Sequence, residues 1–124
     1  MKAVLILISL TFNTLVLACD TLGDRILLED SKKVEVDVYG HAVVKLLARE
    51  VGPVNIFGAR VLENYAGFEC EVVDVVKLSQ GCWEVRVEWS PGADFSGCDV
   101  EVSASSGKRY TAFLFMDFHA HFLN

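Results

Sequence analysis

The stretch Cys70-Glu-Val-Val-Asp-Val-Val-Lys-Leu-Ser-Gln-Gly-Cys-Trp-Glu-Val-Arg-Val-Glu-Trp89 decides the fold of this 124-residue chain. From Trp83 onward apolar and charged residues alternate one by one, which predicts a half-buried strand. The valine-rich segment before it is expected to be a second strand, with Ser-Gln-Gly at 79–81 as the turn. We therefore expect an antiparallel hairpin whose apolar residues at 83–89 face a core and whose charged residues, Glu84 among them, face water.

One register of this hairpin accounts for its charges, because it sets Asp74 opposite Arg86 as a cross-strand ion pair. The same register pairs Leu78 with Cys82, Val75 with Val85, and Val73 with Val87. It also places Cys70 and Cys82 at opposite ends of the hairpin, about eight residues apart at about 3.3 Å per residue. A disulfide requires α-carbons within about 7 Å, so a bond between these two cysteines is disfavoured.

A period of two also dominates the rest of the chain. Further strands are expected at residues 25–28, 33–39, 42–47, 54–62, 99–103 and 109–118. Only Val43 to Glu50 has some helical pattern, and Gly40 and Gly52-Pro53 confine it to a length at which an isolated helix is unstable. Seven or eight short strands predict an all-β fold, a small antiparallel β-sandwich or a small barrel.

The last expected strand is apolar on both faces from Tyr110 to Phe118. A strand of this kind is typical of the middle of a sheet. The alternative is an exposed edge that recruits another chain, which would make the protein a homodimer.

The first eighteen residues have the pattern of a secretory signal peptide, with a basic start at Lys2, an apolar run from Ala3 to Leu17 and a small residue, Ala18, at the cleavage position. A signal needs about 7–15 apolar residues, whereas a membrane span needs about 20, and none follows. We expect residues 1–18 to be removed, a single domain at 19–124, and secretion without a transmembrane anchor.

Four cysteines remain after cleavage: Cys19, Cys70, Cys82 and Cys98. An even number in a secreted chain predicts two disulfides, each worth about 2–4 kcal/mol. Two connectivities stay open, 19–70 with 82–98 and 19–82 with 70–98, as does one bridge plus a covalent dimer contact. The competing hypothesis is a bacterial envelope domain that is anchored by a lipid on Cys19.

The acidic charge excludes one class of partner. With Lys2 removed, 10 lysines and arginines face 17 aspartates and glutamates, a net charge of −7. Nucleic-acid binding draws on clustered basic residues, and no cluster exceeds Lys32-Lys33 or Lys108-Arg109. We therefore expect no nucleic-acid partner.

Catalytic signatures are missing from the sequence, which has no Gly-X-Ser-X-Gly elbow, no His-Glu-X-X-His and no glycine-rich phosphate loop. Asp117, His119 and His121 have a spacing that suits zinc or copper, but surface residues near the end of the chain explain them as well. We expect a non-enzyme with no metal and no cofactor. An apolar-ligand carrier would need a cavity between the sheets, which Val, Trp and Phe more often fill.

The spacing of cysteine and tryptophan resembles an immunoglobulin domain. Cys70 lies thirteen residues before Trp83, as the strand B cysteine precedes the strand C tryptophan in that family. Cys98 follows Trp83 by only fifteen residues, whereas the family's second cysteine comes much later, in strand F. The sequence therefore predicts an immunoglobulin-like variant of the disulfide-stapled sandwich.

The complete pattern, a signal peptide, a small β-rich disulfide domain and a last strand closing on Met116-Asp117-Phe118, resembles the small secreted immunoglobulin-like accessory proteins of coronaviruses. The resemblance implies a viral protein that acts on host secretory or immune proteins.

Together these features predict a secreted, non-catalytic module that binds another protein, and the resemblance implies that the bound protein belongs to a host. The expected contact residues are Tyr65 and Phe68, which flank Ala66-Gly67, and Phe95 in the Ser-Pro-Gly-Ala-Asp-Phe-Ser-Gly segment at 90–97. Aromatic rings in glycine-rich loops bury a large area with few rotatable bonds to freeze, which favours them as binding contacts.

Overall fold

The computed structural model describes residues 23–49, 56–79, 81–93 and 96–117, and in these residues every regular element is a strand. The strands are β1 (Arg25–Leu27), β2 (Lys33–Asp37), β3 (Val44–Arg49), β4 (Ile56–Tyr65), β5 (Glu69–Ser79), β6 (Cys82–Ser90), β7 (Gly97–Ala104) and β8 (Arg109–Phe115). The all-β prediction is confirmed, and the segment with some helical pattern is strand β3. Over the same residues, no helix has the length and apolar character that a membrane span requires.

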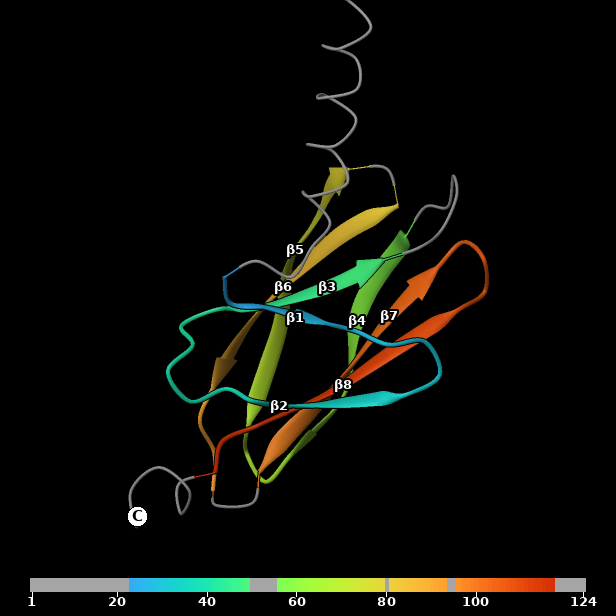
Figure 1. The fold of residues 1–124 in the computed structure, drawn as a ribbon. Coiled ribbons are helices and arrows are strands. Elements are labelled where there is room, and N and C mark those ends of the chain that lie inside the picture. The colour runs from blue at the N-terminus through green and yellow to red at the C-terminus, as the bar shows by residue number, and fades with distance from the viewer. Residues whose placement is uncertain (1–22, 50–55, 80, 94–95, 118–124) are drawn as a thin grey trace, which may run out of the picture.

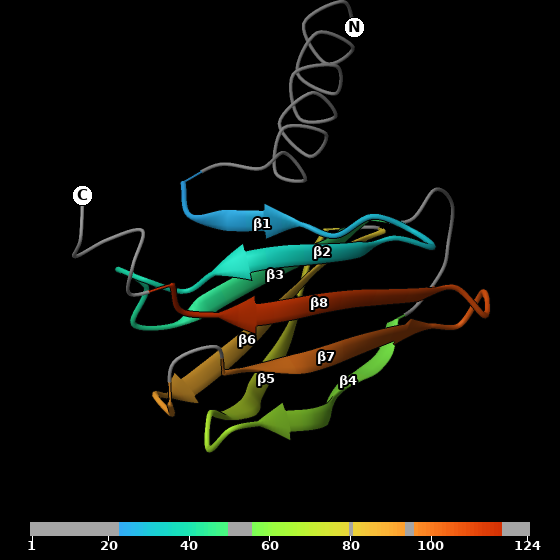
Figure 2. The same ribbon diagram turned by 90° about the horizontal axis from the view of Figure 1, so that it is seen from below.

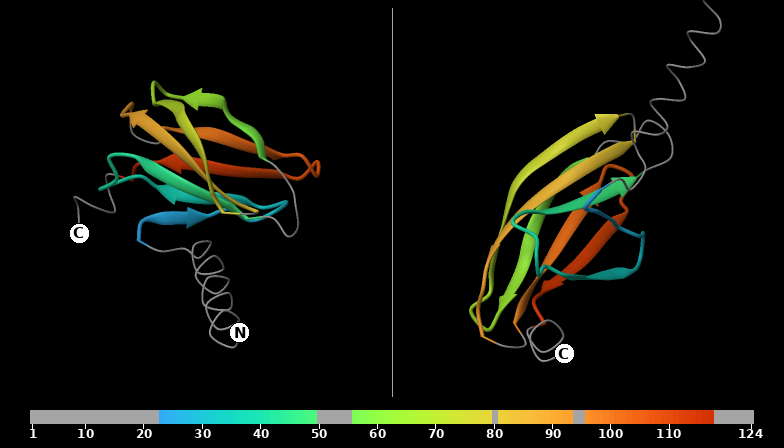
Figure 3. Two further views of the ribbon diagram at one scale, coloured as in Figure 1. Left: turned by 90° about the horizontal axis from the view of Figure 1, so that it is seen from above. Right: turned by 60° about the vertical axis from the view of Figure 1, so that its left-hand side comes forward.

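Two four-stranded sheets pack face to face as a sandwich (Figure 1). One has the strand order β1-β3-β6-β5 and the other β2-β8-β7-β4. In Figure 2 the strands of the second sheet follow one another from β2 at one edge to β4 at the other. In the right-hand view of Figure 3 the β5–β6 hairpin lies in one layer and β7 and β8 lie in the other.

Six of the eight strands follow the order of an immunoglobulin sandwich. Constant-type immunoglobulin domains hold strands A, B, E and D in one sheet and C, F and G in the other. With β3 taken as strand B, the present sheets contain B-E-D and C-F-G, with β1 added beside B and β2 added beside G. β1 runs parallel to β3 and opposite to β2, so these two are not halves of one strand A (Figure 2). The added strand β2 runs parallel to β8, with Lys33 beside Thr111 and Asp37 beside Phe115.

The cysteines depart from the immunoglobulin pattern. We expected Cys70 and Trp83 on strands B and C, and this expectation is wrong. Cys70 lies on β5 and Trp83 on β6, so they occupy neighbouring strands of one sheet. The expectation fails because four strands already precede this hairpin. A disulfide joins Cys70 to Cys98 on β7 and so links the two sheets. This bond belongs to the second of the two predicted connectivities; Cys82 is also disulfide-bonded, and Cys19 lies outside the described residues.

The predicted register holds in the centre of the β5–β6 hairpin. Asp74 lies opposite Arg86 and Val75 opposite Val85, and Arg86 Nη1 is 3.8 Å from Asp74 Oδ2. Towards both ends the predicted pairs are wrong, because Val72 faces Val87 and Ser79 faces Cys82. Irregularities after Val72 and Lys77 shift the pairing, as β-bulges do when two residues oppose one. The adjacent valines of β5 show no alternation of apolar and polar residues, so the sequence does not reveal these irregularities.

The core lies between the sheets and consists of the inward side chains of both. Its largest members with no exposed surface are Phe68, Leu46, Leu114, Val38, Val44, Val85, Val87, Val100 and Val102. Strand β8 lies between β2 and β7, which confirms the predicted central position of the last strand, although β8 ends at Phe115 and not at Phe118.

Glu84 contradicts the simple alternation of β6. It was expected to face water, but only 1% of its surface is exposed. Arg25 Nε and Arg86 Nε each lie 2.7 Å from one of its carboxylate oxygens, and their side chains help cover it. Burial alone would raise the pKa of Glu84, but the hydrogen bonds from Arg25 and Arg86 outweigh it and hold the pKa below its ordinary value.

Candidate functional site

Two loops that the sequence singled out meet at one end of the sandwich, where β4 turns into β5 and β6 leads towards β7 (Figure 1). Ala93 N donates a hydrogen bond to Ala66 O at 3.0 Å. Gly92 packs so tightly there that a β-carbon would lie 2.4 Å from Phe68 N. The turn at Ala66-Gly67 and the loop at Gly92-Ala93 therefore form one rigid surface, which we call the tip. Phe95 lies outside the described residues.

Phe68 does not belong to this surface, and its prediction as a contact residue is corrected. It has no exposed surface, and its ring stacks on Trp89 with centroids 5.4 Å apart and planes 4° from parallel. The cause is the turn before it: Ala66 and Gly67 have φ values of 54° and 79°, and Phe68 N closes the turn on Tyr65 O at 3.1 Å. This conformation turns the ring into the core.

Tyr65 is at the surface and has aromatic neighbours. It is the last residue of β4 and is 36% exposed. Its ring meets the Phe113 ring edge-on at 6.1 Å, and Phe113 in turn stacks on Phe115 at 5.8 Å. Alternate residues of β8 belong to the core, so these two rings lie on the outer face of the sheet. We call Tyr65, Phe113 and Phe115 the aromatic patch.

Gly97 makes room for this patch. It pairs with Tyr65 on one side and with Phe115 on the other. A β-carbon at Gly97 would lie 2.7 Å from Phe113 Cζ and 2.4 Å from Leu114 O, far closer than atoms can approach. The Phe113 ring therefore lies directly over the glycine backbone, which holds it in one position.

Asp99 fixes the ring of Tyr65 through a hydrogen bond. Only 8% of Asp99 is exposed, since it lies on the inner strand β7. The Tyr65 hydroxyl donates to Asp99 Oδ2 at 2.6 Å, and Lys33 Nζ lies 2.9 Å from Asp99 Oδ1. Burial would raise the pKa of Asp99, but the hydrogen bonds from Tyr65 and Lys33 overcome it and lower the pKa. The bond to Asp99 also raises the pKa of Tyr65 far above that of a free phenol, so the hydroxyl keeps its proton.

Carboxylates surround the patch. Glu63 Oε2 is 3.2 Å from the Tyr65 hydroxyl oxygen, Glu35 pairs with Phe113, and Asp37 pairs with Phe115. With Asp99 these make four carboxylates, against the single ammonium of Lys33, so the surroundings of the patch carry a net charge of −3. The outer face of the sheet is therefore electronegative around the rings.

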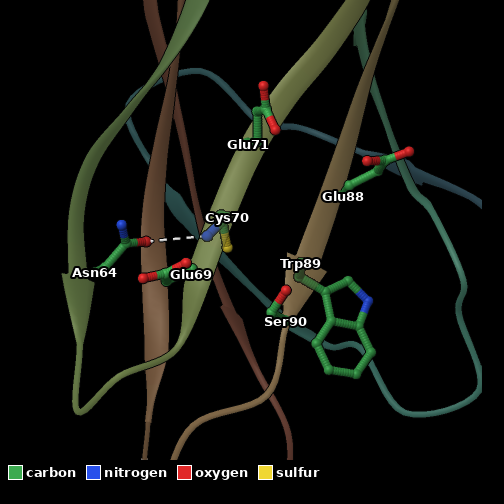
Figure 4. A pocket seen from close by; sticks show the side chains of 7 residues that line it. All are labelled: Asn64, Glu69, Cys70, Glu71, Glu88, Trp89 and Ser90. Carbon is green, nitrogen blue, oxygen red and sulfur yellow. Dashed lines mark hydrogen bonds between the residues drawn. The ribbon is translucent and has the colours of Figure 1, made fainter.

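The other sheet is acidic at the same end. A groove of about 380 Å³ runs between β5 and β6 (Figure 4). Its lining residues are Asn64, Glu69, Cys70, Glu71, Glu88, Trp89 and Ser90. Glu71 lies directly opposite Glu88, and neither forms an ion pair with a cation of the described segments. Asn64 is occupied, because its side-chain oxygen accepts a hydrogen bond from Cys70 N at 3.1 Å.

A metal site is not built into the part of the chain that can be described, where no three His, Cys, Asp or Glu side chains are arranged to hold an ion. His119 and His121 lie outside the described residues. The exposed acidic side chains at Glu29, Asp30, Glu69, Glu71 and Asp74 lie in water, as expected.

Sequence reasoning missed Phe113, Phe115 and Asp99. The apolar character of both faces of β8 predicts a central strand or an edge that recruits another chain, but it does not identify rings on the outer face of the sheet. Gly97 begins β7, but the sequence places it in the glycine-rich segment at 90–97, so nothing in the sequence signalled the close approach of the Phe113 ring. Alternation in the strand at 99–103 would place Asp99 on the wet face, but the side chains that cover it, Tyr65 and Lys33, come from strands far away in sequence.

Comparison with protein-family models, with curated proteins and with solved structures gives no match to this chain.

Proposed function

We propose that this protein is a non-catalytic binding module that recognises another protein through the aromatic patch. The observation that carries the proposal is the patch itself: three rings on the outer face of a sheet, held over Gly97 and fixed by the bond from Tyr65 to Asp99. Aromatic side chains that are rigid before binding lose little conformational entropy on contact, and such residues dominate binding energies at protein interfaces.

The shape of the surface favours a protein over a small molecule. Small ligands occupy concave sites that enclose most of their surface. The aromatic patch instead lies across three strands of one sheet, β4, β7 and β8, and continues into the tip. A large partner can contact the rings and the tip together.

The charge pattern supports a basic partner. The four carboxylates and the one ammonium described around the patch sum to a net charge of −3. Complementary charge increases the rate of encounter and discriminates against acidic partners.

The setting that we propose is extracellular. The signal-like residues 1–18 and the disulfide between Cys70 and Cys98 favour an oxidising compartment. The resemblance to secreted coronavirus accessory proteins favours a host secretory or immune protein as the partner, and the immunoglobulin-type strand order is compatible with that resemblance.

The test is a binding screen of the purified protein against a panel of recombinant receptor ectodomains and secreted immune proteins, by surface plasmon resonance. For a ligand that binds, Tyr65→Ala and Phe113→Ala are expected to weaken the affinity by at least about tenfold. Val73→Ala serves as the control, because Val73 is 43% exposed but lies on β5 in the other sheet.

Circular dichroism of each variant checks that it is folded, so that a loss of binding cannot be caused by a loss of the fold. Equal weakening by all three substitutions, or none by any of them, would show that the patch is not the contact surface. If no protein of the panel binds in a saturable manner, the proposal that this module binds receptor ectodomains or secreted immune proteins is wrong.

A further inference from the structure

The hydrogen bonds around Tyr65 leave one carboxylate without a proton donor. The phenol oxygen lies 2.6 Å from Asp99 Oδ2 and 3.2 Å from Glu63 Oε2, but it has only one proton. The shorter contact takes that proton, since a hydrogen bond to an ionised carboxylate is short and strong. Glu63 therefore presents its negative oxygens beside the ring with no donated hydrogen bond from it.

Lys33 and Arg60, on β2 and β4 of this sheet, are committed elsewhere. Lys33 is bound to Asp99, and Arg60 Nη2 is bound to Glu101 at 3.3 Å. Across the described segments, no lysine, arginine or histidine lies within ion-pair distance of Glu63. The position beside Glu63 and above the aromatic rings is thus open to a cation from outside.

The geometry points to an arginine of the partner. We propose that a guanidinium group stacks on the ring of Tyr65, beside the Phe113 ring, and donates to the Glu63 carboxylate. This inference rests on the proposed binding function and names the chemistry that it selects. A guanidinium is planar, so one face can lie on an aromatic ring while its edge forms paired hydrogen bonds with a carboxylate. An ammonium is a compact, strongly hydrated charge and satisfies only one of the two contacts well.

The experiment is an NMR titration of the folded protein with three peptides: acetyl-Gly-Leu-Arg-Leu-Gly-amide, the same peptide with lysine, and the same with citrulline. Citrulline keeps the shape of arginine but removes its charge. The arginine peptide is expected to shift the Tyr65, Phe113 and Glu63 resonances in a saturable manner. Its affinity is expected to be about fivefold higher than that of the citrulline peptide, with lysine in between.

Two glutamine variants separate a specific contact from general attraction to an acidic protein. Glu63→Gln is expected to lower the affinity for the arginine peptide about fivefold. Glu71→Gln is the matched control, because Glu71 is also exposed but lies in the groove of the other sheet. It is expected to leave the affinity unchanged.

Three results would overturn the inference: no saturable shift at the aromatic patch, equal affinity for the arginine and citrulline peptides, or equal losses from the two glutamine variants. These outcomes are distinct from a failure of the binding function. An ectodomain whose binding depends on Tyr65 and Phe113 but not on Glu63 would refute arginine recognition alone.

Discussion

At the scale of single residues, the two tryptophans differ in one hydrogen bond. Trp89 Nε1 donates to His41 O at 3.0 Å. Trp83 Nε1 is buried, and no acceptor in the described part of the chain reaches it. A buried donor without a partner costs free energy, so the indole of Trp83 contributes less than its size suggests.

We predict that Trp83→Phe changes the free energy of unfolding by less than about 1 kcal/mol, because the loss of area is offset by the removal of an unpaired donor. Trp89→Phe is expected to cost about 1–2 kcal/mol more, since it leaves His41 O without its partner. Urea denaturation of both variants measures the difference. A Trp83→Phe variant less stable than Trp89→Phe would contradict the prediction.

Glu84 determines part of the acid stability. Its pKa is lower in the folded protein than in the unfolded chain, so the folded state binds this proton more weakly. The stabilisation is therefore complete above the ordinary pKa and is lost as the pH falls through the lowered one. Asp99 acts in the same direction.

We predict that Glu84→Gln lowers the free energy of unfolding at pH 7 by about 2–3 kcal/mol, because Arg25 and Arg86 lose the charge that holds them, while their own partial exposure limits the loss. Between pH 5 and pH 2 the variant is expected to lose less stability than the unchanged protein. Thermal unfolding across this range tests both statements, and parallel pH profiles would contradict the role of Glu84.

At the scale of elements, close backbone contacts determine how strands and loops meet. Gly97 admits the Phe113 ring over the backbone of β7, whereas Gly58 on β4 has open space where a β-carbon would be, and its backbone is not strained. The two glycines therefore form a matched pair for testing whether the patch depends on its glycine.

We predict that Gly97→Ala costs about 1–3 kcal/mol of stability and displaces the Phe113 ring, as overpacking does in a tight site. Gly58→Ala is expected to be neutral or slightly stabilising, because alanine restricts the unfolded chain. Denaturation gives the stabilities, and the chemical shifts of the Phe113 ring report its position. Equal effects of the two substitutions would show that Gly97 is not required by the patch.

The hairpin of β5 and β6 shows what alternation can and cannot predict for an element. The pairing of Asp74 with Arg86 followed from matching charges, and the structure confirms it. The shifts after Val72 and Lys77 did not follow, because adjacent valines fit either face of a strand and bulges depend on the twist of the complete sheet.

At the scale of the whole molecule, the disulfide between Cys70 and Cys98 connects the two sheets. It joins two positions that are 28 residues apart in sequence and so closes a loop of the chain. This loop contains all of β6 and ends at the start of β7. A cross-link of this size reduces the conformational freedom of the unfolded chain.

We predict that the double variant Cys70→Ala/Cys98→Ala loses about 3–4 kcal/mol of stability while keeping the sandwich. Guanidinium denaturation measures the loss, and far-ultraviolet circular dichroism checks the strands. A loss below about 1 kcal/mol would mean that packing between the sheets alone, and not the cross-link, holds this end of the molecule.

The sequence by itself determined the strands, the sandwich and the central position of β8, because apolar alternation and turn residues act over a few neighbouring positions. It also narrowed the disulfides to two connectivities and drew attention to Tyr65 and to the loops that meet at the tip. These predictions depend on local geometry, which a chain specifies wherever it folds.

Only the tertiary structure decided the burial of Phe68, the cover over Glu84 and the assembly of the aromatic patch. Each depends on groups distant in sequence: Trp89 beneath Phe68, Arg25 over Glu84, and Asp99 and Gly97 beneath the rings. A side chain's exposure depends on what the rest of the fold places beside it, and no pattern within one strand contains that information.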